Sequence, residues 1–198
     1  MSPDLLVLAP LRLEAFALRR GLPGGAVVRT GMGRARSERA AAGLAGTHSG
    51  AVAVAGVCGA LDPRLVPGEV VVGSELRGAG APRVLESAKP LARALEARGF
   101  AVHIGPIHSC DHLVRSGERA SLVSAGAIAV DMESAWLARL ADSLPFAVLR
   151  VVSDGPRHPL FSPRIVPNGI RALRTLRAVA PALADWATHF THSLEAHR

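Results

Sequence analysis

The chain has 198 residues, of which 49% are hydrophobic and 20% charged, and its formal net charge at pH 7 is +7. This length and balance predict one globular domain, residues 1–198, and argue against a disordered chain. All apolar runs are shorter than the roughly 20 residues that cross a bilayer, which argues against a membrane-spanning protein. No basic residue precedes the apolar segment from Leu5 to Ala9, so we expect no secretory signal and a cytoplasmic location.

The positive charge comes almost entirely from arginine, since Lys89 is the only lysine. The arginines are spread along the chain without a basic arm or an aromatic-rich basic patch, so the pattern does not favour nucleic-acid binding. A basic surface is still compatible with an anionic substrate group or an acidic membrane surface. Cys58 and Cys110 are too few for a zinc site or a disulfide framework, and we expect free thiols.

The predicted elements of the first half alternate between short apolar runs and helically spaced segments. In chain order we expect a strand, a helix, a strand, a helix and two strands, at residues 5–9, 11–20, 26–28, 34–44, 51–57 and 70–72. The segment between the last two strands is too short for a helix, which predicts that these strands form a local antiparallel pair.

The second half continues this alternation after a glycine-rich loop at 78–82. We expect a helix, a strand, a short helix, a strand, a helix and a strand, at residues 91–98, 101–107, 119–124, 127–130, 133–141 and 146–152. A proline-rich loop at 155–167 then leads to one or two helices at 169–195, broken near Pro181. The alternation predicts an α/β fold with a mainly parallel, mixed sheet and helices on both faces.

Acidic residues stand at the carboxyl ends of two predicted strands: Asp131-Met132-Glu133 follows one, and Ser153-Asp154 follows the next. In open α/β sheets ligands bind at such strand ends. Asp131 suits a helix N-cap, whereas the carboxylate of Glu133 suits the hydroxyl pair of a sugar. In an apolar pocket desolvation favours the protonated carboxyl, which suits Asp154 to general acid catalysis, although a turn before Gly155 explains it equally well.

Three further groups have both a functional and a structural interpretation. Glycines in the segment 56–59 follow a strand, where they form either a turn or a loop that lets a ligand approach the backbone. Glu14 belongs either to a site near the first strand or to a solvated helix face. His108 and His112 flank Asp111 with helical metal-ligand spacing, but no third ligand is evident, so we expect no metal site.

Four motifs, taken together and in order, resemble the superfamily of purine nucleoside phosphorylases and methylthioadenosine/S-adenosylhomocysteine nucleosidases. They are a Thr-Gly-x-Gly turn, a glycine segment with the strand after it, a Met-Glu motif and a Ser-Asp motif, at residues 30–33, 54–72, 126–135 and 150–154. The resemblance implies a single-domain, three-layer α/β fold with a mixed, barrel-like central sheet. It also implies an enzyme that cleaves the N-glycosidic bond of a purine nucleoside.

The resemblance further implies a role for each matching residue. Glu133 would bind the ribose hydroxyls, and Met132 would pack under the sugar. Asp154, supported by Ser153, would protonate or hydrogen-bond the purine N7. Glu14 falls where the nucleosidases have their water-activating carboxylate. The segment that would lie along the base or the nucleophile consists of Gly56, Val57, Cys58 and Gly59.

The nucleophile is open between water and phosphate. Pro10-Leu11-Arg12 is similar to the Pro-x-Arg phosphate contact of the phosphorylases, so Arg12 favours phosphate. Val57, however, stands where phosphorylases often have a phosphate-binding serine, and Glu14 favours water. We therefore favour hydrolysis. No cofactor is expected, and inorganic phosphate would be a co-substrate only of a phosphorylase.

Weaker resemblances to particular nucleosidase groups indicate which base and which 5′ substituent the substrate carries. Leu113 lies where the adenosine nucleosidases have a base-stacking phenylalanine, so we expect stacking from Phe161 or His158 instead. Residues 144–150 and 172–181 resemble the hopanoid-associated group, which is thought to remove adenine from adenosylhopane. A methylthioadenosine/S-adenosylhomocysteine nucleosidase and a futalosine nucleosidase are the alternatives.

The resemblance also bears on partners. The expected partner is a small purine nucleoside rather than a nucleic acid, and the family commonly pairs subunits, which predicts a homodimer or a higher homo-oligomer. A lipid-tailed substrate and a basic surface would place the protein near an anionic membrane. The alternative from another class, a non-catalytic nucleotide- or nucleic-acid-binding domain, predicts binding that weakens steeply with salt.

Overall fold

The computed structural model describes residues 5–46, 49–142, 144–160 and 162–195. Its strands are β1 (Leu5–Ala9), β2 (Ala26–Arg29), β3 (Ala51–Ala60), β4 (Val70–Arg77), β5 (Arg83–Val84), β6 (Val102–Ser109), β7 (Ala129–Asp131) and β8 (Phe146–Asp154). Its helices are α1 (Arg12–Gly21), α2 (Arg34–Leu44), α3 (Ala88–Glu96), α4 (Ser116–Ser124), α5 (Ser134–Leu137), the 3₁₀ turn η1 (Ala138–Ala141) and α6 (Ile165–Glu195).

Five strands close into a barrel-like ring. β3 pairs with β7, β7 with β6, β6 with β4, β4 with β8, and β8 again with β3. The β3–β7 and β4–β8 pairs are antiparallel and the other three are parallel. β1 and β2 extend the sheet from β3, and β5 extends it from β4. The predicted mixed, barrel-like α/β sheet is therefore confirmed.

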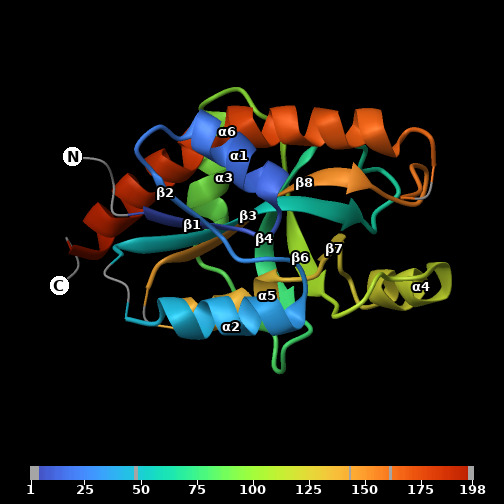
Figure 1. Ribbon diagram of the computed structural model, residues 1–198, viewed down its shortest axis with the longest axis horizontal. Helices are drawn as coiled ribbons and strands as arrows, with labels where there is room; N and C mark the ends of the chain where they lie inside the picture. Colours follow the sequence, from blue (N-terminus) through green and yellow to red (C-terminus); the bar gives the residue numbers. More distant parts are fainter. Residues whose placement is uncertain (1–4, 47–48, 143, 161, 196–198) are drawn as a thin grey trace.

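Helices cover both sides of the strands, with α1, α3 and α6 above and α2 and α5 below in Figure 1. The alternation of side chains along each strand builds one core for each side. In β1, Leu5 and Val7 pack toward α1 and α6, whereas Leu6 and Leu8 pack toward α2 and α5. Since both faces are covered, the strand sequences are continuously apolar rather than alternating.

The predicted antiparallel pairing of the third and fourth strands is wrong. β8 lies between them, parallel to β3 through eight residue pairs, from Val52–Phe146 to Gly59–Asp154, and antiparallel to β4. β4 does run antiparallel to β3, but the strand that separates them, β8, begins more than 70 residues after the start of β4. A short connection indicates nearby strands and does not reveal an insertion from a distant segment.

The segment Gly56–Ala60 was expected to be a loop or a turn, and it is the end of β3. β8 likewise continues through Ser153 and Asp154. Both strands are extended because ring closure gives their ends partners, as in the pairs Gly59–Val130 and Gly59–Asp154. The strand-end residues are thus held by sheet hydrogen bonds rather than by a free loop.

α6 is one helix of 31 residues and continues through Pro181, so the predicted break does not occur. Its apolar side packs against α1, α3 and β8 in one core with Leu176, Val179 and Trp186. This packing compensates for the backbone hydrogen bond that a proline removes. None of the described helices is long and apolar enough to cross a membrane.

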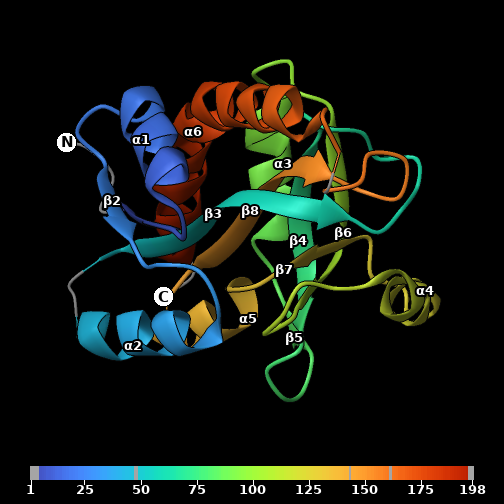
Figure 2. The same cartoon turned by 45° about the vertical axis from the view of Figure 1, so that its right-hand side comes forward.

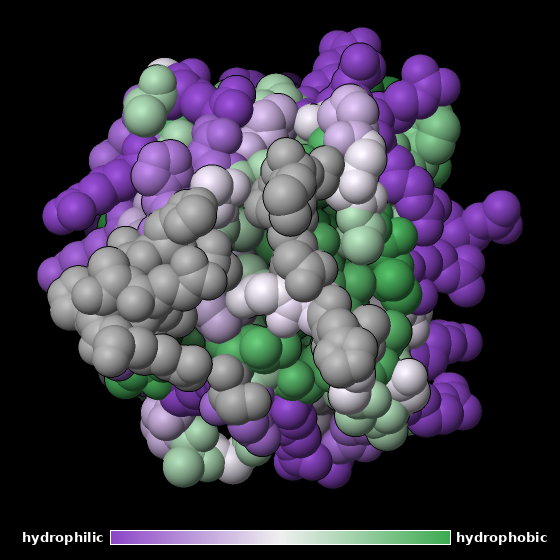
Figure 3. Space-filling model, turned by 90° about the vertical axis from the view of Figure 1, so that its left-hand side faces the viewer, coloured by the Kyte–Doolittle hydropathy of each residue, from purple (hydrophilic) through white to green (hydrophobic). Residues whose placement is uncertain are grey.

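The side of the molecule at which the strands begin differs from the side at which they end. Figure 3 views the side at which β1 and β3 begin, where hydrophilic residues form the rim and hydrophobic ones gather near the centre. The opposite side carries the carboxyl ends of β3, β7 and β8, next to which α4 projects from the body in both Figure 1 and Figure 2. The acidic strand ends found in the sequence lie on that side.

Candidate active site

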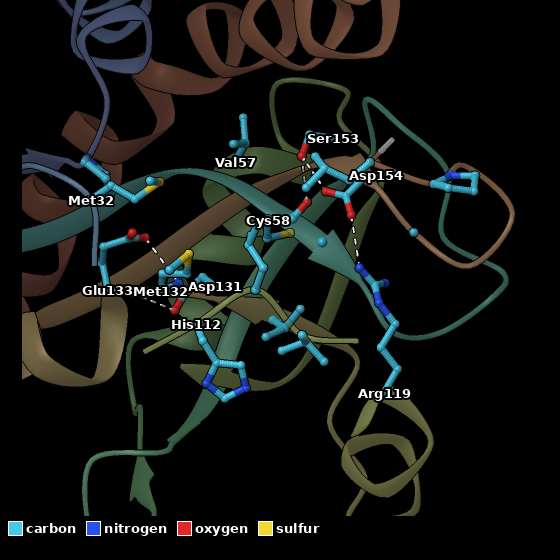
Figure 4. A pocket seen from close by; sticks show the side chains of 18 of the residues that line it. Met32, Val57, Cys58, His112, Arg119, Asp131, Met132, Glu133, Ser153 and Asp154 are labelled. Carbon is cyan, nitrogen blue, oxygen red and sulfur yellow. Dashed lines mark hydrogen bonds and ion pairs between the residues drawn. The ribbon is translucent and has the colours of Figure 1, made fainter. Parts of the chain in front are cut away.

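A pocket of about 1200 Å³ opens where β3, β7 and β8 end. Its wall combines parts of α1, the turn before α2, the segment before α4, and α4 itself (Figure 4). Nine of the predicted catalytic and substrate-binding residues line it: Glu14, Val57, Cys58, Gly59, Leu113, Met132, Glu133, Ser153 and Asp154. The structure therefore brings together residues that lie up to 140 positions apart in the chain.

Glu133 connects the end of β7 to the glycine turn before α2. Its Oε1 accepts a hydrogen bond from the Gly33 amide at 3.1 Å. Gly33 has a φ of +88°, a conformation that residues with a Cβ rarely adopt, so the Thr-Gly-x-Gly turn is needed to aim this amide. Met32 of the same turn and Met132 both lie beside Glu133 at the pocket wall (Figure 4).

A fully buried arginine, Arg150 of β8, lies behind this wall. Its Nη2 is 2.7 Å from Asp131 Oδ2 and 3.6 Å from Glu133 Oε2, and it donates to Ser134 Oγ at 2.8 Å. Asp131 also accepts hydrogen bonds from the Ser109 hydroxyl and from the amides of residues 133 and 134. Asp131 thus accepts hydrogen bonds from the amides at the start of α5, but the N-cap of this helix is Glu133 and not Asp131 as predicted; Asp131 also forms a buried ion pair that the sequence did not indicate.

The ionisation of this cluster follows from burial and from Arg150. Burial opposes the charge of Asp131, but the ion pair with Arg150 and its hydrogen bonds hold the pKa of Asp131 below its usual value. Burial raises the pKa of Glu133 to about 7, although Arg150 acts in the opposite direction. Burial also raises the pKa of Glu14, although the charge of Arg150 lowers it in part. The pocket therefore holds one carboxyl, that of Glu133, with a pKa near neutral pH, and a second, that of Glu14, whose pKa is raised.

Glu14 is buried on α1, so the solvated-face interpretation is wrong for this residue. Its Oε1 accepts a hydrogen bond from the Val57 amide at 2.7 Å, and its Oε2 accepts one from the Leu11 amide at 2.7 Å. The second contact also stabilises the first turn of α1. Glu14 thereby joins the helix start to the end of β3.

Gly56 is the reason that Glu14 and Arg150 can approach β3 so closely. A Cβ at this position would lie 2.7 Å from both Arg150 Nη1 and Glu14 Oε1. The glycine therefore serves the packing of two charged side chains, and it is not itself among the lining residues. Its neighbours Val57, Cys58 and Gly59 face the pocket.

Gly56→Ala is expected to destabilise the protein by about 1–3 kcal/mol, because overpacking must displace Arg150 or Glu14. Urea denaturation of the purified variant measures this loss. Gly43→Ala is the matched control, since nothing lies within 4 Å of a Cβ at this position in α2, and alanine favours a helix by up to about 1 kcal/mol. Equal stabilities of the two variants would contradict the packing role of Gly56.

Asp154 lies at the end of β8 between two donors (Figure 4). The Ser153 hydroxyl is 3.0 Å from its Oδ1 and 3.1 Å from the Cys58 carbonyl. Arg119 of α4 donates from Nη2 to Asp154 Oδ2 at 3.1 Å and from Nη1 to the Ala60 carbonyl at 2.9 Å. Arg119 was missed in the sequence because an arginine inside a short polar helix carries no local signal. Arg150, four residues before Asp154 on β8, pairs instead with Asp131 and Glu133.

The remaining sequence candidates lie at or beyond the mouth of the pocket. Arg12 is exposed and is not among the lining residues, whereas the half-exposed Leu113 is. His112 lies at the wall and contacts Asp111 and Glu118. Phe161, expected to stack on a base, lies outside the described residues, and His158 is not among the lining residues. Within the described part of the chain, no group of three or more His, Cys, Asp or Glu residues is arranged to hold a metal ion.

The fold is shared with solved nucleosidases. The Campylobacter jejuni 5′-methylthioadenosine/S-adenosyl homocysteine nucleosidase (MTAN) superposes with a TM-score of 0.79 at 14% identity, covering 92% of this chain and 97% of that one. A mutant of Helicobacter pylori futalosine hydrolase gives 0.78 at 17%, covering 91% and 98%. A Helicobacter pylori MTAN mutant with 5′-methylthioadenosine in its active site gives 0.76 at 17%, covering 96% and 100%.

At the level of sequence, no curated protein matches the chain. A family model described as the phosphorylase superfamily matches residues 25–180, a stretch that contains all four motifs noted above. The resemblance drawn from those motifs is thereby confirmed. Because the match spans more than half of its length, the chain belongs to the phosphorylase superfamily and is an enzyme of that family.

Proposed function

We propose that this enzyme cleaves the N-glycosidic bond of a purine nucleoside with a 5′ substituent and releases the free base. The observation that carries the proposal is the meeting in one pocket of Glu14 from α1, Glu133 from the turn between β7 and α5, and Asp154 from β8. The similar folds named as nucleosidases of methylthioadenosine and futalosine support the same reaction class.

In the proposed reaction the C1′–N9 bond breaks and its electron pair passes to the purine. The sugar becomes cationic and the leaving base anionic, so charge must be stabilised at both ends. Ionised Glu133 would accept hydrogen bonds from the ribose hydroxyls beside Met132, and a proton from Asp154 would neutralise the base at N7. Water would add its oxygen to C1′ and give its proton to Glu14. A positioned acid or base of this kind contributes roughly 10²–10⁴-fold to a rate.

The positions of two residues favour water over phosphate as the nucleophile. Glu14 is buried and lines the pocket, and its raised pKa suits a general base. Arg12, the candidate phosphate ligand, is exposed and outside the lining. We therefore propose hydrolysis without a cofactor; inorganic phosphate would be the co-substrate if the enzyme were a phosphorylase.

The test is base release from a panel of purine nucleosides with methylthio, homocysteinylthio and long alkyl groups at the 5′ position. Each is assayed with phosphate and after its complete removal. Release without phosphate is the expected result. Release that strictly requires phosphate would refute hydrolysis and favour Arg12 as a ligand. No release from any member under either condition would refute the proposed function.

The finer substrate proposal is adenosylhopane, whose aliphatic tail needs an apolar entrance. The mouth of the pocket offers Leu11, Met32 and Leu113, all substantially exposed. The net charge of +7 would favour binding of the protein to an anionic membrane surface. We also propose that the enzyme is a homodimer or a higher homo-oligomer. The long-alkyl member of the panel, presented in anionic vesicles, should then be cleaved faster than the methylthio member. The reverse order would favour a methylthioadenosine/S-adenosylhomocysteine or futalosine nucleosidase.

The kcat/KM of the wild type is expected to fall as pH is lowered through about 7. Burial raises the pKa of Glu133 to about 7, and only its ionised form accepts hydrogen bonds from both hydroxyls of a sugar. A profile between about pH 5.5 and 8.5 measures this, because kcat/KM reports ionisations of the free enzyme. Glu133→Gln should have a lower kcat/KM and lack the acidic limb; an unchanged limb would assign the titration to another group.

A further inference from the structure

Large apolar side chains are exposed on two neighbouring helices, α1 and α6. The two helices lie side by side on the same side of the sheet in both Figure 1 and Figure 2, and they share one core. On α1, Leu13 is 64% exposed and Phe16 57%. On α6, Val166 is 65% exposed and Ile170 46%. The members of each pair are three or four residues apart, so each helix presents one apolar stripe to solvent.

The packing of the helices brings the two stripes together. A Cβ at Gly21 would lie 2.1 Å from the Arg177 carbonyl oxygen, so the end of α1 rests against the middle of α6. Leu13 stands two helical turns before Gly21, and Ile170 two turns before Arg177, which places both on the sides where the helices meet. Both helices also begin near the pocket, since residues 10, 11, 159 and 160 line it. The stripes therefore flank one line of contact that leads toward the pocket.

The same two helices carry a dense positive charge. Glu14, the only acid of α1, is buried, and residues 155–184 contain no Asp or Glu. The charge also contacts the apolar stripe, because the guanidinium carbon of Arg20 lies 5.0 Å from the centre of the Phe16 ring. Six arginines of the two helices are exposed: Arg12, Arg19 and Arg20 on α1, and Arg171, Arg174 and Arg177 on α6.

We propose that these four apolar side chains and six arginines, here called the α1–α6 face, form a docking surface for an anionic membrane. Apolar side chains on such a surface enter the boundary between headgroups and acyl chains, while arginines bind the lipid phosphates. The long stem of arginine allows both at once, since it packs on apolar groups and keeps its charge in water. A nucleic acid would pair with the arginines but leave the apolar stripes in water, so the face fits a membrane better.

The inference deepens the proposed function, on which it rests for the purpose of docking. Binding through the α1–α6 face brings the lipid surface close to the start of α1, where Leu11 is at the mouth of the pocket and Glu14 is inside. A nucleoside with an aliphatic 5′ group would then move from the bilayer to the pocket without exposing its chain to water. The net charge explains attraction to a membrane, whereas this face explains the orientation.

The experiment measures co-sedimentation of the purified protein with phosphatidylglycerol vesicles and with phosphatidylcholine vesicles, in the absence of substrate. The wild type should bind the anionic vesicles about tenfold or more tightly than the neutral ones, and salt should weaken the binding. Phe16→Gln combined with Val166→Gln should weaken it about tenfold or more, because two apolar groups no longer enter the lipid. Arg174→Gln combined with Arg177→Gln should have a loss of similar size.

The matched controls change the same residue types elsewhere. Val84→Gln alters a side chain of β5 that is 71% exposed, and Arg39→Gln removes an exposed cation of α2, which covers the other side of the sheet (Figure 1). Both should bind vesicles as the wild type does. Thermal unfolding shows that each variant is folded; if the apolar double variant is not, the arginine double variant decides.

The outcomes separate the docking surface from the proposed function. Failure of the wild type to bind anionic vesicles overturns the inference, and so do equal affinities of the face variants and the controls. A dimer that only the face variants dissociate, with unchanged vesicle binding, would assign the face to a second copy and also overturn it. Base release from soluble 5′-methylthioadenosine should be unchanged in the face variants. Vesicle binding without base release from any member of the panel would refute the proposed function alone.

Discussion

Asp154→Asn is expected to lower turnover roughly 10²–10⁴-fold while the protein stays folded. An amide keeps the shape of the carboxyl and a hydrogen-bond acceptor for Ser153, but it cannot transfer a proton to a leaving base. With its one oxygen facing Ser153, its NH2 group replaces Oδ2, the acceptor of the Arg119 hydrogen bond in the wild type, so that hydrogen bond is lost. The measurement is base release under single-turnover conditions, with thermal unfolding of the same sample.

The control for charge removal is Asp142→Asn. The side chain of Asp142 is 79% exposed and pairs with Arg83 away from the pocket, so its loss should leave turnover unchanged. Surface ion pairs contribute at most about 1 kcal/mol, so Asp142→Asn should not unfold the protein. Unchanged turnover in Asp154→Asn would remove Asp154 from the chemistry and leave the turn before Gly155 as its explanation.

Arg150→Met is expected to destabilise the protein by about 3–5 kcal/mol at neutral pH, because it leaves buried carboxylates without their cation. Arg150 is fully buried and contacts Asp131 and Glu133, and its charge lowers the pKa of Glu14. Urea denaturation measures the change in the free energy of unfolding. Arg93→Met, at an exposed position of α3, is the matched control and should change stability little.

The deficit of Arg150→Met should shrink as the pH is lowered. Without the cation, burial raises the pKa of Glu133 and Glu14 further above the values of the unfolded chain. A raised pKa in the folded state costs no stability below the unfolded pKa, and the cost grows as pH rises toward the folded pKa. The variant should therefore lose stability on going from about pH 5 to pH 8 more steeply than the wild type. A deficit independent of pH would contradict the charged state of the cluster.

The position of the acids could be predicted from local pattern. Apolar runs ending in Asp-Met-Glu and Ser-Asp already place Glu133 and Asp154 at strand ends, because hydrophobic periodicity and strand length are properties of a few neighbouring residues. The identity of the family followed from the order of four such motifs. The pairing of the strands could not be derived in this way, since β8 inserts between β3 and β4 through contacts between distant segments.

By itself the sequence determined the α/β class, the superfamily and the carboxyls at the strand ends, because each of these follows from patterns within short segments of the chain. Only the tertiary structure decided what surrounds those carboxyls. Glu133 meets an amide 100 residues away at Gly33, and Asp154 meets Arg119 from a helix that only ring closure brings near. The ionisation of the acids, and with it their chemistry, depends on burial and on these distant partners, because the free energy of a charge is set by its three-dimensional surroundings.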